Sequence, residues 1–145
     1  MKKLLSLILA LIMIAVPMCV QTYATEGEAN YDDLVMPCYT YISSISACIT
    51  EGSLGFVNCL SNCTSFQTDK TFVLTCNLQR TDGSDAWKTY KTKTETFSGK
   101  GSFYVDKSWF APANYAYRVV TTLTVKNSAG TVVETATKAS AVLYK

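Results

Sequence analysis

The residues best able to do chemistry in this sequence are its cysteines. Six are present, and there is no histidine. Cys19 lies in an apolar N-terminal stretch, and the other five are Cys38, Cys48, Cys59, Cys63 and Cys76. A thiolate zinc site normally uses two pairs of ligands, each pair about two to four residues apart. Cys59 and Cys63 form one such pair, and on one extended strand they would lie about 13 Å apart. The spacing therefore argues against a metal site.

Cys59 and Cys76 are the two cysteines that a disulfide would best join. We expect both to point into the core, nearly equidistant from a loop centred near Gln67. A bridge would close a loop of about 17 residues, which the chain-entropy relation values at about 3 kcal/mol. The alternative is that both are free, buried thiols that pack as small apolar groups. Cys38 and Cys48 lie off the core-facing positions, so one of them could link two chains.

The lack of histidine also bears on catalysis. Histidine-based triads, cysteine–histidine dyads and histidine metal sites all require a residue that is absent. The acid pairs Asp32/Asp33 and Asp82/Asp85 lie in a flexible lead and in a hairpin turn, where nothing would bury a catalytic carboxylate. Serine–lysine chemistry stays open on composition, but no motif supports it. We therefore expect a protein that is not an enzyme and uses no cofactor or metal.

Aromatic residues are the candidate binding groups. Trp87, Tyr90, Trp109 and Phe110, together with Tyr104, exceed what a core of this size needs. Exposed aromatic rings stack well on sugars and anchor protein partners. They predict a carbohydrate-binding module as one alternative function. The competing interpretation is that Trp109 and Phe110 cover the end of the core.

The N-terminus has the layout of a secretory signal. Lys2 and Lys3 precede an apolar run over residues 4–16, which Pro17 ends, and small residues follow up to Ala24. A membrane-spanning helix needs roughly 20 apolar residues, which is more than this run supplies. We expect cleavage near Ala24, a secreted mature protein and no membrane span after cleavage.

Charge is distributed unevenly in the expected mature chain. Residues 25–69 hold six acids and no Lys or Arg, whereas residues 70–145 hold eleven Lys and Arg against five acids. The sum, eleven minus eleven, is zero. A nucleic-acid binder would carry a concentrated basic stripe, so we expect no nucleic-acid partner. Residues 25–37 form an acidic segment that we interpret as a flexible lead before a domain over residues 38–145.

From residue 39 onward the chain is rich in Thr, Val, Tyr and Phe and shows no sustained helical periodicity. Residues Thr71–Arg80 alternate clearly, with Phe72 and Leu78 among the inward positions. The lysine-rich fourth segment is typical of an edge strand. Seven strands are predicted: 39–50, 55–63, 71–80, 86–97, 102–105 with an alternative end at 110, 115–126 and 131–144.

Seven short strands joined by tight turns predict an all-β, immunoglobulin-like antiparallel sandwich, preceded by the signal-peptide helix. Tyr117 falls near the start of the sixth strand, where that fold places a tyrosine corner. On the final strand, the alternation puts Val133, Ala139, Ala141 and Leu143 on one face.

The element Met36-Pro37-Cys38-Tyr39-Thr40-Tyr41-Ile42 resembles the opening of a group of small secreted proteins of Gram-positive, often gut-dwelling, bacteria. Further short similarities lie at 58–59, 78–80, 87–89, 115–119 and 133–138. The family is uncharacterised, so the resemblance implies secretion and a β-sandwich but no chemistry. Family members commonly have a basic residue after the proline, where this chain has Cys38.

Together these observations predict a secreted, non-enzymatic sandwich that acts in extracellular recognition or decorates a cell surface. Its partner would be an extracellular protein or glycan. The alternatives are the carbohydrate-binding module and a secreted effector.

Overall fold

A computed structural model describes residues 38–83 and 86–145 of the chain. The predicted signal peptide and the acidic lead lie outside the described residues. The described part is all-β, and its strands are β1 (Ser44–Glu51), β2 (Phe56–Ser65), β3 (Thr71–Thr81), β4 (Lys88–Ser98), β5 (Gly101–Phe110), β6 (Ala116–Lys126), β7 (Val132–Ala139) and β8 (Leu143–Tyr144).

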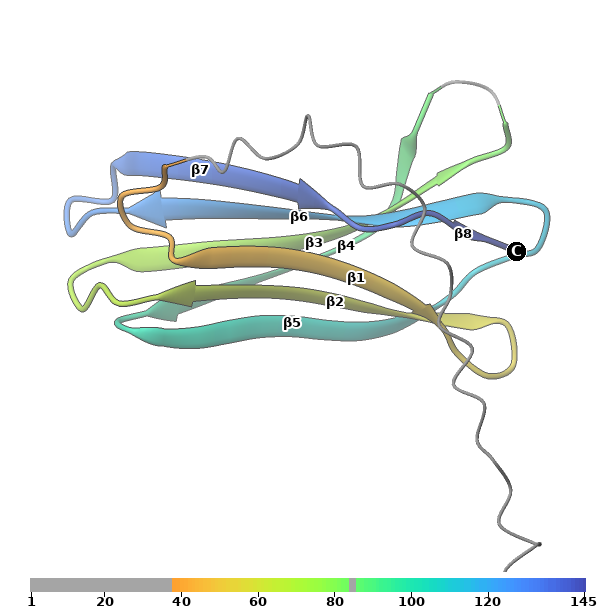
Figure 1. Ribbon diagram of the computed structural model, residues 1–145, viewed down its shortest axis with the longest axis horizontal. Coiled ribbons are helices and arrows are strands. Elements are labelled where there is room, and N and C mark those ends of the chain that lie inside the picture. Colours follow the sequence, from red (N-terminus) through yellow and green to blue (C-terminus); the bar gives the residue numbers. More distant parts are fainter. Residues whose placement is uncertain (1–37, 84–85) are drawn as a thin grey trace, which may run out of the picture. The chain divides into compact units, whose positions relative to one another are not determined.

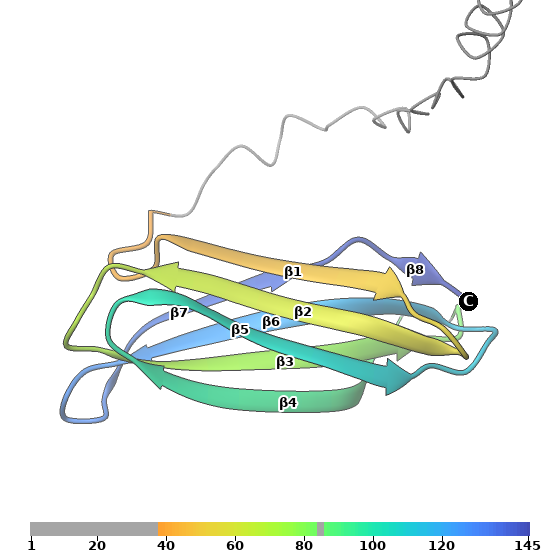
Figure 2. The same cartoon turned by 90° about the horizontal axis from the view of Figure 1, so that it is seen from below.

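The strands form two antiparallel sheets packed face to face (Figures 1 and 2). One sheet has the order β1-β2-β5, and the other has the order β4-β3-β6-β7, with β8 also paired to β6. This is the predicted immunoglobulin-like sandwich, with β4 joined to β3 rather than to β5. β4 lies at the edge of its sheet, as its lysines indicated.

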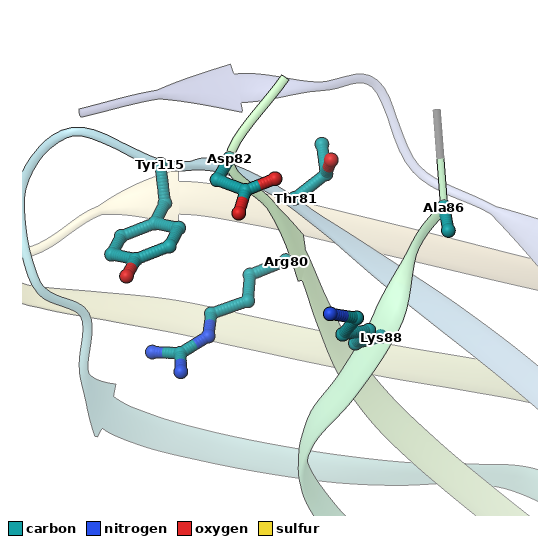
Figure 3. A pocket seen from close by; sticks show the side chains of 6 residues that line it. All are labelled: Arg80, Thr81, Asp82, Ala86, Lys88 and Tyr115. Atoms are coloured by element: carbon teal, nitrogen blue, oxygen red, sulfur yellow. The ribbon is translucent and has the colours of Figure 1, made fainter. Parts of the chain in front are cut away.

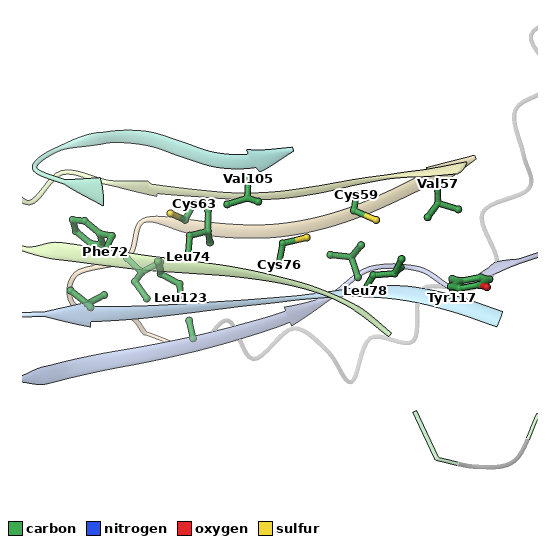
Figure 4. Close-up of a cluster of buried hydrophobic side chains, with 14 of the residues drawn as sticks. Val57, Cys59, Cys63, Phe72, Leu74, Cys76, Leu78, Val105, Tyr117 and Leu123 are labelled. Atoms are coloured by element: carbon green, nitrogen blue, oxygen red, sulfur yellow. The ribbon is translucent and has the colours of Figure 1, made fainter. Parts of the chain in front are cut away.

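The core lies between the sheets and follows the alternation of the sequence. On β6, and on β3 as far as Leu78, every second residue is buried, including Phe72, Leu74 and Leu123, each fully inaccessible to solvent. Figure 4 shows these side chains meeting those of β2 and β5. Burying a side chain of this size contributes roughly 1.5–3 kcal/mol, so this double row of side chains stabilises the fold.

A tyrosine corner closes the loop before β6. Tyr117 is fully buried, and its hydroxyl donates a hydrogen bond of 2.7 Å to the backbone carbonyl of Pro112. This confirms the position predicted from the sequence and fixes the turn that leads out of β5.

The first predicted strand begins too early. Residues 39–43 lie outside β1, and the backbone N–H groups of Thr40 and Tyr41 donate to the Glu134 carboxylate at 2.7 and 3.0 Å. A side chain of β7 thus replaces the neighbouring strand as their partner. Apolar patterning could not reveal this, because it depends on an acid more than ninety residues away.

The predicted inward face of the last strand is also wrong at Val133, Ala139 and Ala141, because these residues are exposed and Ala136 is buried instead. A register shift between Val125 and Lys126 places one extra residue in β7, which reverses the alternation. A second irregularity follows at Ser140, whose hydroxyl accepts from the Val119 N–H at 2.9 Å and separates β7 from β8.

Candidate binding site

The candidate site lies at the loop end of the β3–β4 hairpin, where β3 ends at Thr81 and β4 begins at Lys88. Arg80 follows Leu78 on the core-facing side of β3 and is paired with Lys88 of β4. Leu78 is paired with Lys91 and Gln79 with Thr89, so the residue between them in β4, Tyr90, is an extra, unpaired residue. Such a bulge redirects a side chain, and here the ring of Tyr90 meets Arg80.

Arg80 is held between two tyrosines. The centre of its guanidinium lies 4.3 Å from the ring centroid of Tyr90 and 4.6 Å from that of Tyr115. A planar guanidinium stacks well on aromatic faces while its edge N–H groups point outward as donors, and here the Arg80 side chain also hydrogen-bonds the Tyr117 hydroxyl. Burial raises the pKa of the adjacent Tyr117 hydroxyl, and the charge of Arg80 partly opposes that rise. The cation is therefore fixed in place by rings on both sides.

A hollow of about 100 Å³ lies beside this stack. Figure 3 shows the side chains of Arg80, Lys88 and Tyr115 around it. Its full lining is Arg80, Thr81, Asp82, Ala86, Lys88 and Tyr115. Two cations against one acid give the lining a formal charge of +1, and the volume suits one small anionic group.

The ion pairs among residues 38–83 and 86–145 involve neither of the two cations. They join Lys70 to Asp69, Lys93 to Glu95 at 3.2 Å and Lys145 to Glu51 at 3.9 Å. Arg80 and Lys88 therefore face the hollow as adjacent like charges. Two like charges at directly opposed positions of a strand pair destabilise each other. A bound anion would remove that repulsion.

The four predicted binding aromatics do not form one platform. Trp87 is half-buried and stacks with Arg118, whose guanidinium lies 4.3 Å from its ring. Tyr90 belongs to the Arg80 stack. Trp109 packs against the core, and Phe110 is 53 % exposed beside Phe56, with ring centroids 5.8 Å apart. A flat sugar-stacking surface built from all four is therefore absent from the described structure.

The cysteines fall into two groups. Cys59, Cys63 and Cys76 are fully buried, whereas Cys38 and Cys48 are exposed. Figure 4 shows the three buried thiols between the sheets. All five are free in this structure, so the Cys59–Cys76 disulfide stays a prediction. Cys59 and Cys63 share strand β2, as expected, and both face the core.

Burial sets the chemistry of the inner thiols. It raises the pKa of Cys59 from 9.0 to about 12 and that of Cys63 to about 11, and it also raises the pKa of Cys76. Protonated thiols are poor nucleophiles and poor metal ligands. Among the described residues no group of three or more Cys, Asp or Glu side chains is arranged to hold a metal ion. No helix within the described part of the chain is long and apolar enough to cross a membrane.

In comparisons with known proteins, neither a family model nor a curated protein matches this chain.

Sequence reasoning missed Arg80, Lys88 and Tyr115. The facing positions of Arg80 and Lys88 depend on the β-bulge, which no apolar pattern announces. The one signal available was the Asp82-Gly83 turn, which fixes the hairpin and so brings the residues on its two sides together.

Proposed function

We propose that the chain is exported and that the mature protein is a non-enzymatic recognition domain that binds an acidic extracellular glycan at the Arg80–Lys88 hollow. The signal layout of residues 1–24 supports export. One observation carries the choice of ligand. A guanidinium fixed between Tyr90 and Tyr115 faces the same hollow as the ammonium group of Lys88.

The size of the hollow favours a glycan over a folded protein partner. About 100 Å³ takes a carboxylate or sulfate substituent but no large side chain. Charge-assisted bonds to such groups are about twice as strong as neutral ones, and an arginine fork binds them with two parallel N–H groups. The recognised unit is therefore a single charged substituent of the glycan.

Binding of four polymers to the mature chain tests this function: polygalacturonate, chondroitin sulfate, dextran sulfate and neutral dextran. We expect affinity for charged polymers that falls as salt is raised, and no binding to neutral dextran. Lys88→Gln should weaken binding by about ten- to a hundred-fold, since a charge-assisted hydrogen bond contributes about 1.5–3 kcal/mol.

Lys138→Gln is the matched control, because Lys138 is an exposed lysine on β7, distant in strand order from β4. It should leave affinity unchanged. Equal loss in the two variants would show diffuse charge attraction instead of a site. Arg80→Lys keeps the charge and loses the planar fork, so it should also weaken binding.

A further inference from the structure

A second hollow, of about 350 Å³, runs along the free edge of β5. It is lined by six consecutive residues, Ser102 to Lys107, together with Glu95 and Phe97 of β4. Consecutive residues of a strand point to opposite faces of its sheet. A hollow that touches all six therefore lies beside the backbone edge of the strand and not on either face.

The backbone groups along this edge are unpaired. β5 is the last strand of its sheet, and β2 is its neighbour on the other side. The Ala111 N–H donates to the Gly55 carbonyl at 2.9 Å, which continues the ladder between β5 and β2. Because amide direction alternates along a strand, the N–H and C=O groups of Ser102, Tyr104 and Asp106 point away from β2. No described residue satisfies them.

A strand can enter here because β4 and β5 separate. They share the turn after Ser98 and then separate, as Figure 1 shows. Near the turn the rings of Phe97 and Phe103 stack at 4.8 Å and close the space between the sheets. Beyond them the edge of β5 is open.

Charge determines what kind of strand fits. β4, β5 and the turn between them carry five lysines (Lys88, Lys91, Lys93, Lys100 and Lys107) against Glu95 and Asp106, a formal charge of +3. Lysines on an edge repel the same edge of a second copy. An acidic segment meets no such repulsion. The acidic lead, residues 25–37, holds four acids and no Lys or Arg, a formal charge of −4.

We propose that the acidic lead of one copy adds as a strand to the free edge of β5 in a second copy, linking exported chains head to tail. This requires residue 25 to be the start of the exported chain. The thirteen residues of the lead can span the ten residues of β5. Its Leu34 and Val35 would supply apolar contacts near Phe103. Strand addition of this kind takes affinity from main-chain hydrogen bonds.

The attachment point of the lead favours a second copy over its own domain. Thr40 and Tyr41 are fixed to Glu134 of β7, and β7 and β4 are at opposite edges of their sheet. Three strand spacings of about 4.8 Å separate those edges. Reaching its own β5 would use about four residues of the lead before any pairing began. On a neighbour, the lead can pair along the whole length of β5, which has ten residues.

Sedimentation velocity of the chain from residue 25, over a range of concentrations, tests this proposal. We expect concentration-dependent assemblies that dissociate as salt is raised. Asp32→Lys with Asp33→Lys should give monomers, and so should Lys100→Glu with Lys107→Glu. An equimolar mixture of these two double variants should form a complex, because the unchanged lead of the second variant, of formal charge −4, can pair with the unchanged edge of the first, of formal charge +3. Lys126→Glu with Lys138→Glu, on β6 and β7, is the control and should assemble as the parent does.

A direct binding measurement makes the result independent of assembly size. A fluorescent peptide of residues 25–37 should bind the Asp32→Lys, Asp33→Lys protein, and Tyr104→Pro should abolish binding by removing an edge N–H. Far-ultraviolet circular dichroism checks that this variant folds, and the Lys100→Glu, Lys107→Glu protein gives the same readout without proline. A parent chain that stays monomeric, or a mixture that fails to assemble, would overturn the proposal. Neither result depends on the Arg80–Lys88 hollow.

Discussion

The hydroxyl of Thr121 on β6 lies 2.7 Å from the hydroxyl of Ser61 on β2, and both residues are fully buried. Thr121 Oγ1, whose single proton serves one acceptor at a time, also lies 3.1 Å from the backbone carbonyl oxygen of Ser46. This small polar cluster joins the two sheets inside an otherwise apolar core. Every buried side-chain polar atom of the described residues has a partner, so the cluster is fully satisfied.

Thr121→Val should therefore lower the free energy of unfolding by about 1–3 kcal/mol, because it removes the partner of Ser61 and leaves a buried hydroxyl group less well paired. Adding Ser61→Ala should recover part of that loss, since the unsatisfied group is then gone. Urea unfolding of both single variants and of the double variant measures the coupling. Strictly additive losses would show that the two hydroxyls do not stabilise each other.

Tyr117→Phe should cost about 1–2 kcal/mol of stability, because it leaves the Pro112 carbonyl without its hydrogen bond while keeping the buried ring. Tyr104→Phe is the matched control, since Tyr104 is 65 % exposed and should lose almost nothing. Thermal unfolding of the two variants beside the parent makes the comparison. If the two variants were equally stable, the hydrogen bond from Tyr117 to the Pro112 carbonyl would not contribute to the stability of the fold.

The fold was predictable where alternation is uninterrupted. On β3 and β6 the inward residues run without a break from one end of the strand to the other, so period-two reading placed Phe72 and Leu123 in the core. It failed on β7, where one extra residue reverses the faces after Val133. A bulge is a one-residue change in pairing, and it has no apolar signature of its own.

The candidate site was less predictable for the same reason. The bulge beside Leu78 turns Tyr90 toward Arg80. Tyr115, which lies in the loop between β5 and β6, contacts the same guanidinium. Such a contact depends on tertiary structure, and a list of exposed aromatics could not select it. The predicted Trp87 instead stacks with Arg118, a residue that sequence spacing does not associate with it.

Alkaline pH should destabilise the reduced protein through its buried thiols. The pKa of Cys59 is about 12 and that of Cys63 about 11 in the folded chain, against 9.0 for an ordinary thiol. Below about pH 9 both states hold these protons, so stability is unaffected. Above it the unfolded chain ionises first, and the free energy of unfolding falls until the folded thiols also ionise.

Each such thiol should add a slope of about 1.4 kcal/mol per pH unit within this window. Unfolding by urea in reductant, between pH 8 and about pH 11, measures the slope. Cys59→Ala should reduce it. Cys38→Ser, at an exposed cysteine, is the control and should keep it. An unchanged slope in Cys59→Ala would show that ionisation of Cys59 does not cause the loss of stability at alkaline pH.

Oxidation of the chain should join Cys59 to Cys76. Both are buried, on β2 and β3 of opposite sheets, and Cys76 is near enough for its charge to help raise the pKa of Cys59. Refolding with a glutathione redox pair, followed by intact mass measurement, should show a loss of two hydrogens. The bridge should add about 3 kcal/mol of stability for a loop of about 17 residues.

Two cysteine variants decide which thiols form this bridge. Cys76→Ala should abolish the mass change. Cys63→Ala should retain it, because Cys63 and Cys59 lie on the same extended strand, too far apart to form a disulfide with each other. Formation of the bridge should also remove the Cys59 part of the alkaline slope, since a disulfide has no proton to lose. Complete alkylation of the oxidised, denatured chain would instead leave Cys59 and Cys76 as free packing residues of the core.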